Sequence, residues 1–136
     1  MLMKYTSNQV LGADLSPEAL QRLVQAGGKA SSLKEIMAEA DIVVSTTGAT
    51  GLIKPEMVRR GQIILALSNP NPEIEPDIAM KAGAAFAADG KTVNNVLGFP
   101  GIFRGAVDTN ARRISNEMLI AAAEMIASQT PEGELV

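Results

Sequence analysis

Residues 40–68 read ADIVVSTTGATGLIKPEMVRRGQIILALS, and they contain two apolar segments separated by a glycine-rich loop. The run 42–46 is β-branched and apolar on both faces, which is typical of a buried parallel strand. The run 62–68 has the same character. Between these two strands, the small residues 47–51 predict a loop, and residues 55–60 predict a short helix that ends at a glycine.

Strand-like and helix-like segments continue to alternate on both sides of this stretch. The alternation predicts an α/β fold, namely a partial doubly wound, Rossmann-like parallel sheet flanked by helices. We expect one domain over residues 9–128, with flexible ends at 1–8 and 129–136. For the Gly-rich apolar segment that ends near Asp108, the sequence predicts neither a helix nor a strand. The further predicted elements are strands at 9–13 and 84–88, an extended segment at 29–31, and helices at 17–26, 33–39, 76–82 and 116–128.

The composition narrows the chemistry that this chain can perform. Its 136 residues include no Cys and no His, and a formal net charge of −3 arises from 12 basic and 15 acidic side chains. The two zeros exclude disulfides, thiol nucleophiles, Cys-based metal sites and a histidine general base. No Lys/Arg run exceeds two residues and no apolar run approaches the roughly 18 residues that span a bilayer. We therefore expect a cytoplasmic protein with no nucleic-acid or membrane partner.

Asp14 follows the first predicted strand, and in parallel α/β sheets ligands bind beyond the carboxyl ends of the strands. One interpretation makes Asp14 the acid that accepts hydrogen bonds from an adenosine ribose. The other makes it a loop residue whose charge favours the N-terminus of the next helix. The GxGxxG turn that usually precedes such a strand does not occur in this sequence.

The loop after the strand at 42–46 is a second candidate site. Its residues either let a ligand approach the backbone closely or form a tight connection to the next helix. Lys54 stands too near Gly48 for the spacing of a phosphate-binding P-loop. The candidate residues of this loop are Thr46, Thr47, Gly48 and Ala49.

Asparagine side chains provide the remaining polar candidates. Asn69 begins the segment Asn-Pro-Asn-Pro at 69–72, directly after the strand at 62–68. Its uncharged amide suits recognition of a carboxamide or a hydroxyl, although asparagine and proline are also routine in turns. The pair Asn94 and Asn95 leaves the same two interpretations open.

Three acids, Glu73, Glu75 and Asp77, follow the proline-rich segment and suggest a metal site. They also surround Pro76, where a helix is predicted to begin. Acidic residues are expected in a first helical turn because they complement the helix dipole. We therefore interpret these acids as part of a helix start and predict no metal site here.

Three segments of the chain resemble the NAD-binding domain of bacterial-type malic enzymes. They are ADIVVSTTGATGLIKPEMV at 40–58, IILALSNPNPEI at 63–74 and VNNVLGFPGIFRGA at 93–106. The second and third segments are specific to that family, whereas other nicotinamide-binding domains share the strand and glycine loop. The resemblance extends over about residues 9–128.

This resemblance implies the coenzyme-binding portion of an enzyme that oxidatively decarboxylates malate to pyruvate and CO2. The cofactor would be NAD, or alternatively NADP, and a divalent metal, Mg or Mn, is expected only in the complete enzyme. The resemblance places Asn69, Asn94 and Asn95 against the substrate and the nicotinamide half of the cofactor. It brings residues 46–49 near the cofactor and Asp14 beside the adenosine ribose. There a carboxylate favours NAD because it repels the 2′-phosphate of NADP.

In the family, the catalytic Tyr and Lys, the carboxylate metal ligands and the glycine-rich turn lie upstream of the resembling region. Tyr5 stands in a context that does not fit that catalytic Tyr. We therefore predict no catalytic residue in this chain, inactivity in isolation, and a requirement for the N-terminal catalytic part or a subunit that carries it. Because strand 9–13 lacks its first-strand neighbour, we also expect marginal stability or self-association as a homo-oligomer.

Two other functions remain open. One is a non-catalytic nucleotide-binding or subunit-pairing module that kept the fold. The other is a different nicotinamide enzyme, similar to adenosylhomocysteinase, although the segment 94–101 argues against it. Co-purification with a partner that carries the missing Tyr and Lys would favour a split enzyme over a module.

Overall fold

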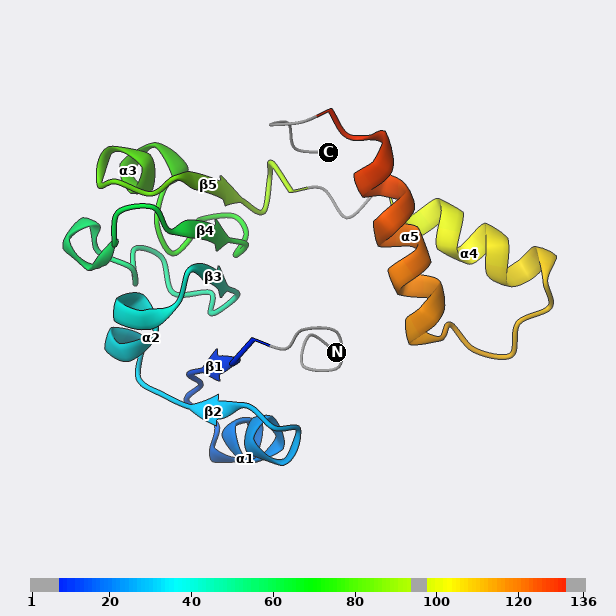
Figure 1. Cartoon of the computed structure of the whole chain (residues 1–136), viewed down its shortest axis with the longest axis horizontal. Helices are drawn as coiled ribbons and strands as arrows, with labels where there is room; N and C mark the ends of the chain where they lie inside the picture. Colours follow the sequence, from blue (N-terminus) through cyan, green and yellow to red (C-terminus); the bar gives the residue numbers. More distant parts are fainter. Residues whose placement is uncertain (1–7, 94–97, 132–136) are drawn as a thin grey trace. The chain divides into compact units, whose positions relative to one another are not determined.

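The computed structural model describes residues 8–93 and 98–131 (Figure 1). The chain divides into two compact units, residues 1–90 and residues 91–136. The single domain predicted over 9–128 therefore covers parts of both units, which are described separately below. Most of the ends predicted to be flexible lie outside the described residues.

The smaller sheet of the first unit has two parallel strands joined by a helix. The helix begins where the sequence predicts, because Ser16 accepts the backbone N–H of Ala19 at 3.2 Å and Pro17 occupies the first helical position. Among the described residues, the first strand pairs with the second strand alone. These elements are β1 (Leu11–Gly12), α1 (Pro17–Gln25) and β2 (Lys29–Ala30).

The larger sheet of the first unit has three parallel strands in the order β3-β4-β5. The helix that precedes it starts with a capping box, in which Ser32 and Glu35 each accept the other's backbone N–H. The short helix expected at 55–60 is a single 3-10 turn. The elements are α2 (Leu33–Glu39), β3 (Ile42–Ser45), η2 (Pro55–Met57), β4 (Ile63–Ala66), α3 (Pro76–Lys81) and β5 (Phe86–Asp89).

The register of this sheet aligns the carboxyl ends of its strands. Ser45 lies opposite Ala66, and Ala66 lies opposite Asp89. The segments that leave the three strands therefore start from one edge of the sheet, as expected for parallel strands joined by crossovers. The predicted α/β class with parallel strands and flanking helices is confirmed, although the strands form two small sheets.

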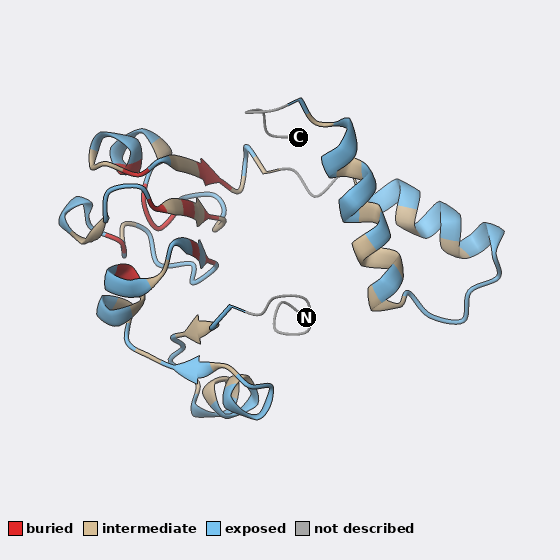
Figure 2. Cartoon of the chain, viewed as in Figure 1, coloured by how far each residue is buried: buried red, intermediate tan, exposed pale blue. Residues whose placement is uncertain are grey.

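The core of the first unit lies on one face of the larger sheet (Figure 2). Val43 and Ser45 of β3 are buried, whereas Ile42 and Val44 are 60% and 53% exposed. The prediction that this strand is buried on both faces is therefore wrong for this chain, because the core packs against the face that carries Val43. The buried core residues are Met37, Val43, Ile53, Ile64, Ala66, Ile74, Ala79 and Ala84.

The second unit consists of two helices, α4 (Gly98–Asp108) and α5 (Asn116–Gln129). The glycine-rich segment, for which the sequence predicts no helix or strand, forms α4. Its proline, Pro100, lies in the first turn, where a missing backbone N–H breaks no intrahelical hydrogen bond. The start of α5 agrees with the sequence, because Ser115 accepts the backbone N–H of Met118 at 3.3 Å.

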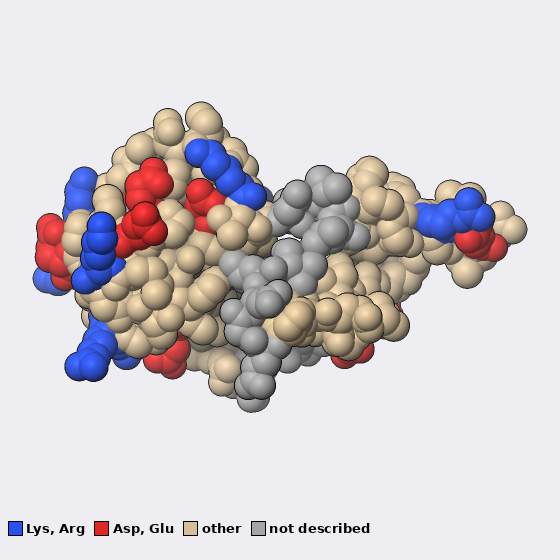
Figure 3. Space-filling model, turned by 90° about the horizontal axis from the view of Figure 1, so that it is seen from above, with Lys and Arg blue, Asp and Glu red and all other residues tan. Residues whose placement is uncertain are grey.

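Charged side chains of both signs are interspersed on the face of the chain seen in Figure 3, with uncharged surface between them. The ion pairs of the described residues include those between Arg59 and Asp41 and between Arg104 and Asp108, each at 2.8 Å. Within residues 8–93 and 98–131, no helix combines the length and the apolar character needed to cross a membrane.

Candidate functional site

The polar groups at the carboxyl ends of β3 and β4 converge on one carboxylate. Glu73 is fully buried, and its Oε1 accepts the backbone N–H of Thr47 at 2.6 Å and the Thr47 hydroxyl at 2.8 Å. The same oxygen accepts the hydroxyl of Ser68 at 2.6 Å. Ser68 Oγ in turn accepts the backbone N–H of Gly48 at 2.8 Å. We call this group, Thr47, Gly48, Ser68 and Glu73, the Glu73 network.

Three neighbouring pieces of chain position the Glu73 network. The backbone N–H of Leu67 donates to the carbonyl of Ser45 at 2.8 Å, which extends the pairing of β3 and β4 beyond their last residues. Gly48 has a φ of +73°, a conformation that L side chains rarely adopt. The backbone N–H of Ile53 donates to the carbonyl of Glu73 at 3.0 Å and holds the proline-rich segment against the loop.

The hydrogen bonds determine the charge of Glu73. Burial raises the pKa of Glu73, but the hydrogen bonds from Ser68 and Thr47 stabilise the carboxylate more strongly and lower the pKa from 4.5 to about 2. Its second oxygen, Oε2, is buried and has no hydrogen-bond partner. At neutral pH the network therefore encloses a full negative charge.

The role of Glu73 differs from every interpretation of it in the sequence. The sequence pattern groups it with Glu75 and Asp77 as acids of a helix start, and of the three only Glu75 and Asp77 are exposed. Among the described residues, no three Asp or Glu side chains gather as a metal site. In the sequence, the one sign that Glu73 is buried is its position between two apolar residues, Pro72 and Ile74. The structure shows that both of these neighbours are buried.

Asn69 lies beside this network, at the carboxyl end of β4. Its side chain is exposed, and its Nδ2 is 3.5 Å from the carbonyl oxygen of Gly90, which follows β5. A Cβ at Gly90 would come within 2.5 Å of the Leu67 carbonyl oxygen and 2.9 Å of Asn69 Nδ2. Glycine at position 90 thus permits the two strand ends to approach closely. The peptide bond between Asn69 and Pro70 is cis.

Asp14 lies at the end of β1, in the smaller sheet. It is exposed, and its Oδ1 accepts the backbone N–H of Ser16 at 2.8 Å, just before α1. This contact agrees with the interpretation of Asp14 as a residue of a helix start, and it leaves the ribose interpretation untested.

The structure therefore brings together only some of the predicted site residues. The loop residues 46–49 and Asn69 lie at the same end of the larger sheet, where Thr47 and Gly48 belong to the Glu73 network and Asn69 follows Ser68. Asp14 belongs to the other sheet of the same unit. Asn94 and Asn95 lie outside the described residues.

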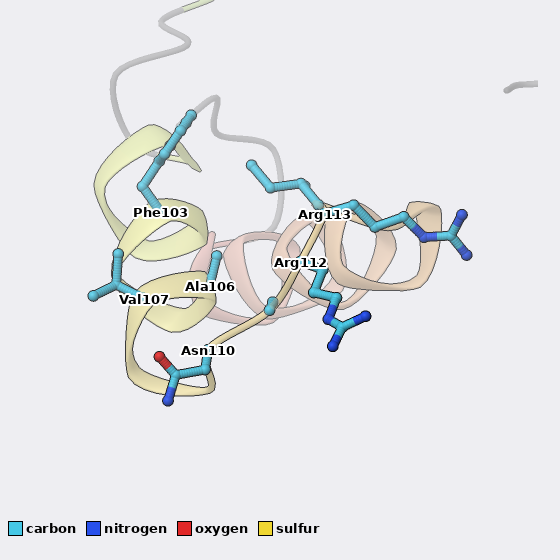
Figure 4. Close-up of a pocket in the computed structure, with 8 residues that line it drawn as sticks. Phe103, Ala106, Val107, Asn110, Arg112 and Arg113 are labelled. Atoms are coloured by element: carbon cyan, nitrogen blue, oxygen red, sulfur yellow. The ribbon is translucent and has the colours of Figure 1, made fainter.

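A separate groove of about 430 Å³ lies in the second unit, between α4 and the segment that leads to α5. Phe103 and Val107 form part of its wall, and the guanidinium groups of Arg112 and Arg113 point away from them (Figure 4). A ligand site normally combines an apolar wall with convergent polar groups. This groove has an apolar wall, but its charged side chains do not point toward that wall.

Comparison with known proteins gives a consistent result. Residues 76–136 match the family model described as the NAD-binding domain of malic enzyme. NAD-dependent malic enzyme 1 of Bacillus subtilis (strain 168) is 59% identical over 137 residues, which cover 100% of this chain and 31% of that protein.

This chain is homologous to a bacterial NAD-dependent malic enzyme.

Other malic enzymes support the same conclusion. The bifunctional malic/malolactic enzyme of B. subtilis (strain 168) is 48% identical over 79% of this chain and 28% of its own length. The crystal structure of NAD-dependent malic enzyme from Thermotoga maritima has a TM-score of 0.70 at 33% identity, over 84% of this chain and 33% of that one. The chain thus spans about a third of the length of these relatives, and its residues 76–136 match the NAD-binding domain of the family.

Proposed function

We propose that this chain binds a nicotinamide dinucleotide, as the coenzyme-binding portion of an enzyme that oxidatively decarboxylates malate to pyruvate and CO2. The observation that carries the proposal is the homology of the whole chain to NAD-dependent malic enzyme 1 of B. subtilis, at 59% identity. The geometry supports it, because exposed polar groups lie at the carboxyl ends of two adjacent parallel strands, where α/β folds bind ligands.

In this proposal the nicotinamide half of the cofactor and the substrate lie near Asn69. Its exposed amide carries both donors and an acceptor, which suits a carboxamide or a hydroxyl group. The exposed residues 46–49 provide the surface beside it. Asn94 and Asn95 are proposed to join this site on the strength of the motif that they begin.

Asp14 is proposed to contact the adenosine ribose and to favour NAD over NADP. Its carboxylate is exposed at the end of β1, so it is accessible to hydroxyl donors of a ribose. A 2′-phosphate would be repelled by the same charge. Relatives with both preferences exist, since an NADP-dependent malic enzyme of Rhizobium meliloti (strain 1021) is 42% identical to this chain over 110 residues.

We propose that the acid–base residues and the divalent metal, Mg or Mn, come from a part of the enzyme outside these 136 residues. The sequence has no His and no Cys, and the described residues hold no group of three acidic side chains that suits a metal. The 136-residue chain alone is therefore expected to leave malate and NAD unchanged. A cytoplasmic location and a homo-oligomeric state remain predictions from the sequence.

Calorimetric titration with NAD tests the proposal on the 136-residue chain. We expect saturable binding that Asn69→Ala weakens, while Asn71→Ala, an exposed asparagine of the same segment, leaves it unchanged. Asp14→Asn should raise the affinity for NADP relative to NAD. Absence of NAD binding, or equal effects of the two asparagine variants, would overturn the assignment. Turnover of malate by this chain, measured as NADH absorbance, would overturn the proposal that the acid–base residues and the metal lie outside these 136 residues.

A second candidate, a subunit-pairing module, is supported by apolar side chains that the described residues leave uncovered. Phe99, Phe103 and Val107, spaced four residues apart on α4, are 63%, 47% and 70% exposed. Contiguous exposed apolar surface often marks a protein–protein interface. Sedimentation of the chain as a monomer over a wide concentration range would reject this candidate.

A further inference from the structure

In the loop after β3, the backbone donors of residues 47–49 are all engaged within the chain. The N–H of Thr47 donates to Glu73 Oε1 at 2.6 Å, and that of Gly48 donates to Ser68 Oγ at 2.8 Å. The N–H of Ala49 donates to Thr47 Oγ1 at 3.2 Å. Both hydroxyls donate onward to the same carboxylate oxygen of Glu73. Three consecutive N–H groups thus lead directly or through one hydroxyl to a single buried acceptor.

This pattern is the opposite of a phosphate-binding loop. Phosphate sites in α/β folds present free backbone N–H groups to the anion, usually where a helix starts. Here those N–H groups point inward, and the charge that they surround is negative. A phosphate placed at this loop would find no free N–H on residues 47–49 and would be repelled by Glu73. The glycine and small residues of the loop nevertheless allow close approach of a ligand.

We propose that Glu73 is a positioning residue, which occupies the backbone donors of residues 47–49 and so leaves the end of β3 and β4 to the nicotinamide–ribose half of the dinucleotide. This inference rests on the proposed function. The nicotinamide–ribose half carries hydroxyl and carboxamide donors, and its ring is cationic in the oxidised cofactor. The pyrophosphate and other phosphate groups are excluded from this position.

The chemistry of Glu73 explains why a carboxylate is needed. A carboxylate is purely an acceptor, so Oε1 can receive three donors at once. A glutamine would keep the shape but remove the charge, and it would place an NH2 group where the buried Oε2 has no partner. The loop would then be held less tightly, and its donors would become available to other ligands. Glu75, two residues away and exposed, allows the same change of charge without touching the network.

Two ligands that differ in the nicotinamide ring test the inference on the full chain. NAD and ADP-ribose share the adenosine, the pyrophosphate and the second ribose, so the ratio of their dissociation constants reports the nicotinamide ring with its carboxamide. For Glu73→Gln we expect NAD binding to weaken about tenfold and ADP-ribose binding to change less than about twofold. Glu75→Gln should change neither. Equal weakening of both ligands, or the same effect in Glu75→Gln, would overturn the inference, because a general loss of structure affects both ligands alike.

Amide hydrogen exchange separates this inference from the proposed function. In the free chain, Glu73→Gln should speed exchange at Thr47 and Gly48 about a hundredfold, while Ile64 in the centre of β4 stays protected. If wild type binds neither ligand, the proposed function fails for this chain, and unchanged exchange at these two amides would still overturn the positioning role. If Glu73→Gln does not fold, Ser68→Ala replaces it, with the effect expected at Gly48.

Discussion

The pH dependence of stability offers the sharpest test of the Glu73 network. In wild type, Glu73 is fully buried as a carboxylate that accepts three hydrogen bonds through one oxygen. Glu73→Gln keeps the size of the side chain and removes its charge. The charged acceptor is what strengthens these bonds, since hydrogen bonds to ionised groups are roughly twice as strong as neutral ones. We therefore expect the variant to be less stable near neutral pH.

The magnitude follows from the pKa of Glu73. Burial raises this pKa, the hydrogen bonds from Ser68 and Thr47 outweigh burial, and the result is a fall from 4.5 to about 2. That difference corresponds to about 3 kcal/mol of unfolding free energy. Because the folded-state pKa is the lower one, this stability is fully present above pH 4.5 and is lost as the pH falls toward about 2. The gap between wild type and Glu73→Gln should therefore close over the same interval.

Urea unfolding, followed by circular dichroism from about pH 7 to about pH 2, measures this gap. Near pH 7 we expect wild type to exceed Glu73→Gln by about 3 kcal/mol and Glu75→Gln to match wild type. Ser68→Ala removes one of the three hydrogen bonds, so it should cost about 1.5 kcal/mol and show the same dependence on pH. Ser68→Ala also provides the test if Glu73→Gln is too unstable to fold. A gap that stays constant down to the lowest pH would refute the reasoning, because it would show that the charge of Glu73 contributes nothing.

Three further predictions concern packing, and urea unfolding measures each of them. Gly90→Ala should lose about 2 kcal/mol, since its Cβ would lie 2.5 Å from the Leu67 carbonyl oxygen, and unchanged stability would contradict the close approach. Gly105→Ala should stabilise α4 by up to about 1 kcal/mol, because a Cβ there meets no atom within 4 Å, and any loss would show that α4 is not a regular helix in solution. Gln62→Leu should lose about 2 kcal/mol, since the fully buried Gln62 donates to the Met37 carbonyl at 2.8 Å and accepts the backbone N–H of Arg59 at 2.8 Å. A neutral effect of Gln62→Leu would mean that water satisfies those groups.

Local signals made the starts of the helices predictable. Ser16, Ser32 and Ser115 each accept a backbone N–H three residues further along, and this interaction depends on the nearby sequence alone. The helix α4 was missed for the same local reason, since Gly98, Gly101 and Gly105 lower its intrinsic helix propensity. Packing outweighs propensity there: at Gly98, a Cβ would lie 3.7 Å from the side chain of Ile126 in α5.

The Glu73 network was beyond local sequence reasoning. Glu73 is separated from Thr47 by 26 residues, so their contact depends on the register of β3 with β4 and on the path of the proline-rich segment. A sequence pattern can place Thr47 and Ser68 at strand ends, but it cannot show which buried group their hydroxyls reach. The predicted positions of the loop and of Asn69 at one edge were accessible because parallel strands end together.

The exposed face of β3 connects the fold to the proposed function. Ile42 and Val44 have the apolar, β-branched character of a strand covered on both sides, yet more than half of each side chain is exposed. Burial of an aliphatic side chain contributes roughly 1.5 to 3 kcal/mol, so leaving two of them exposed forgoes a substantial part of the stability of a small domain. A partner that covers this face would recover that energy.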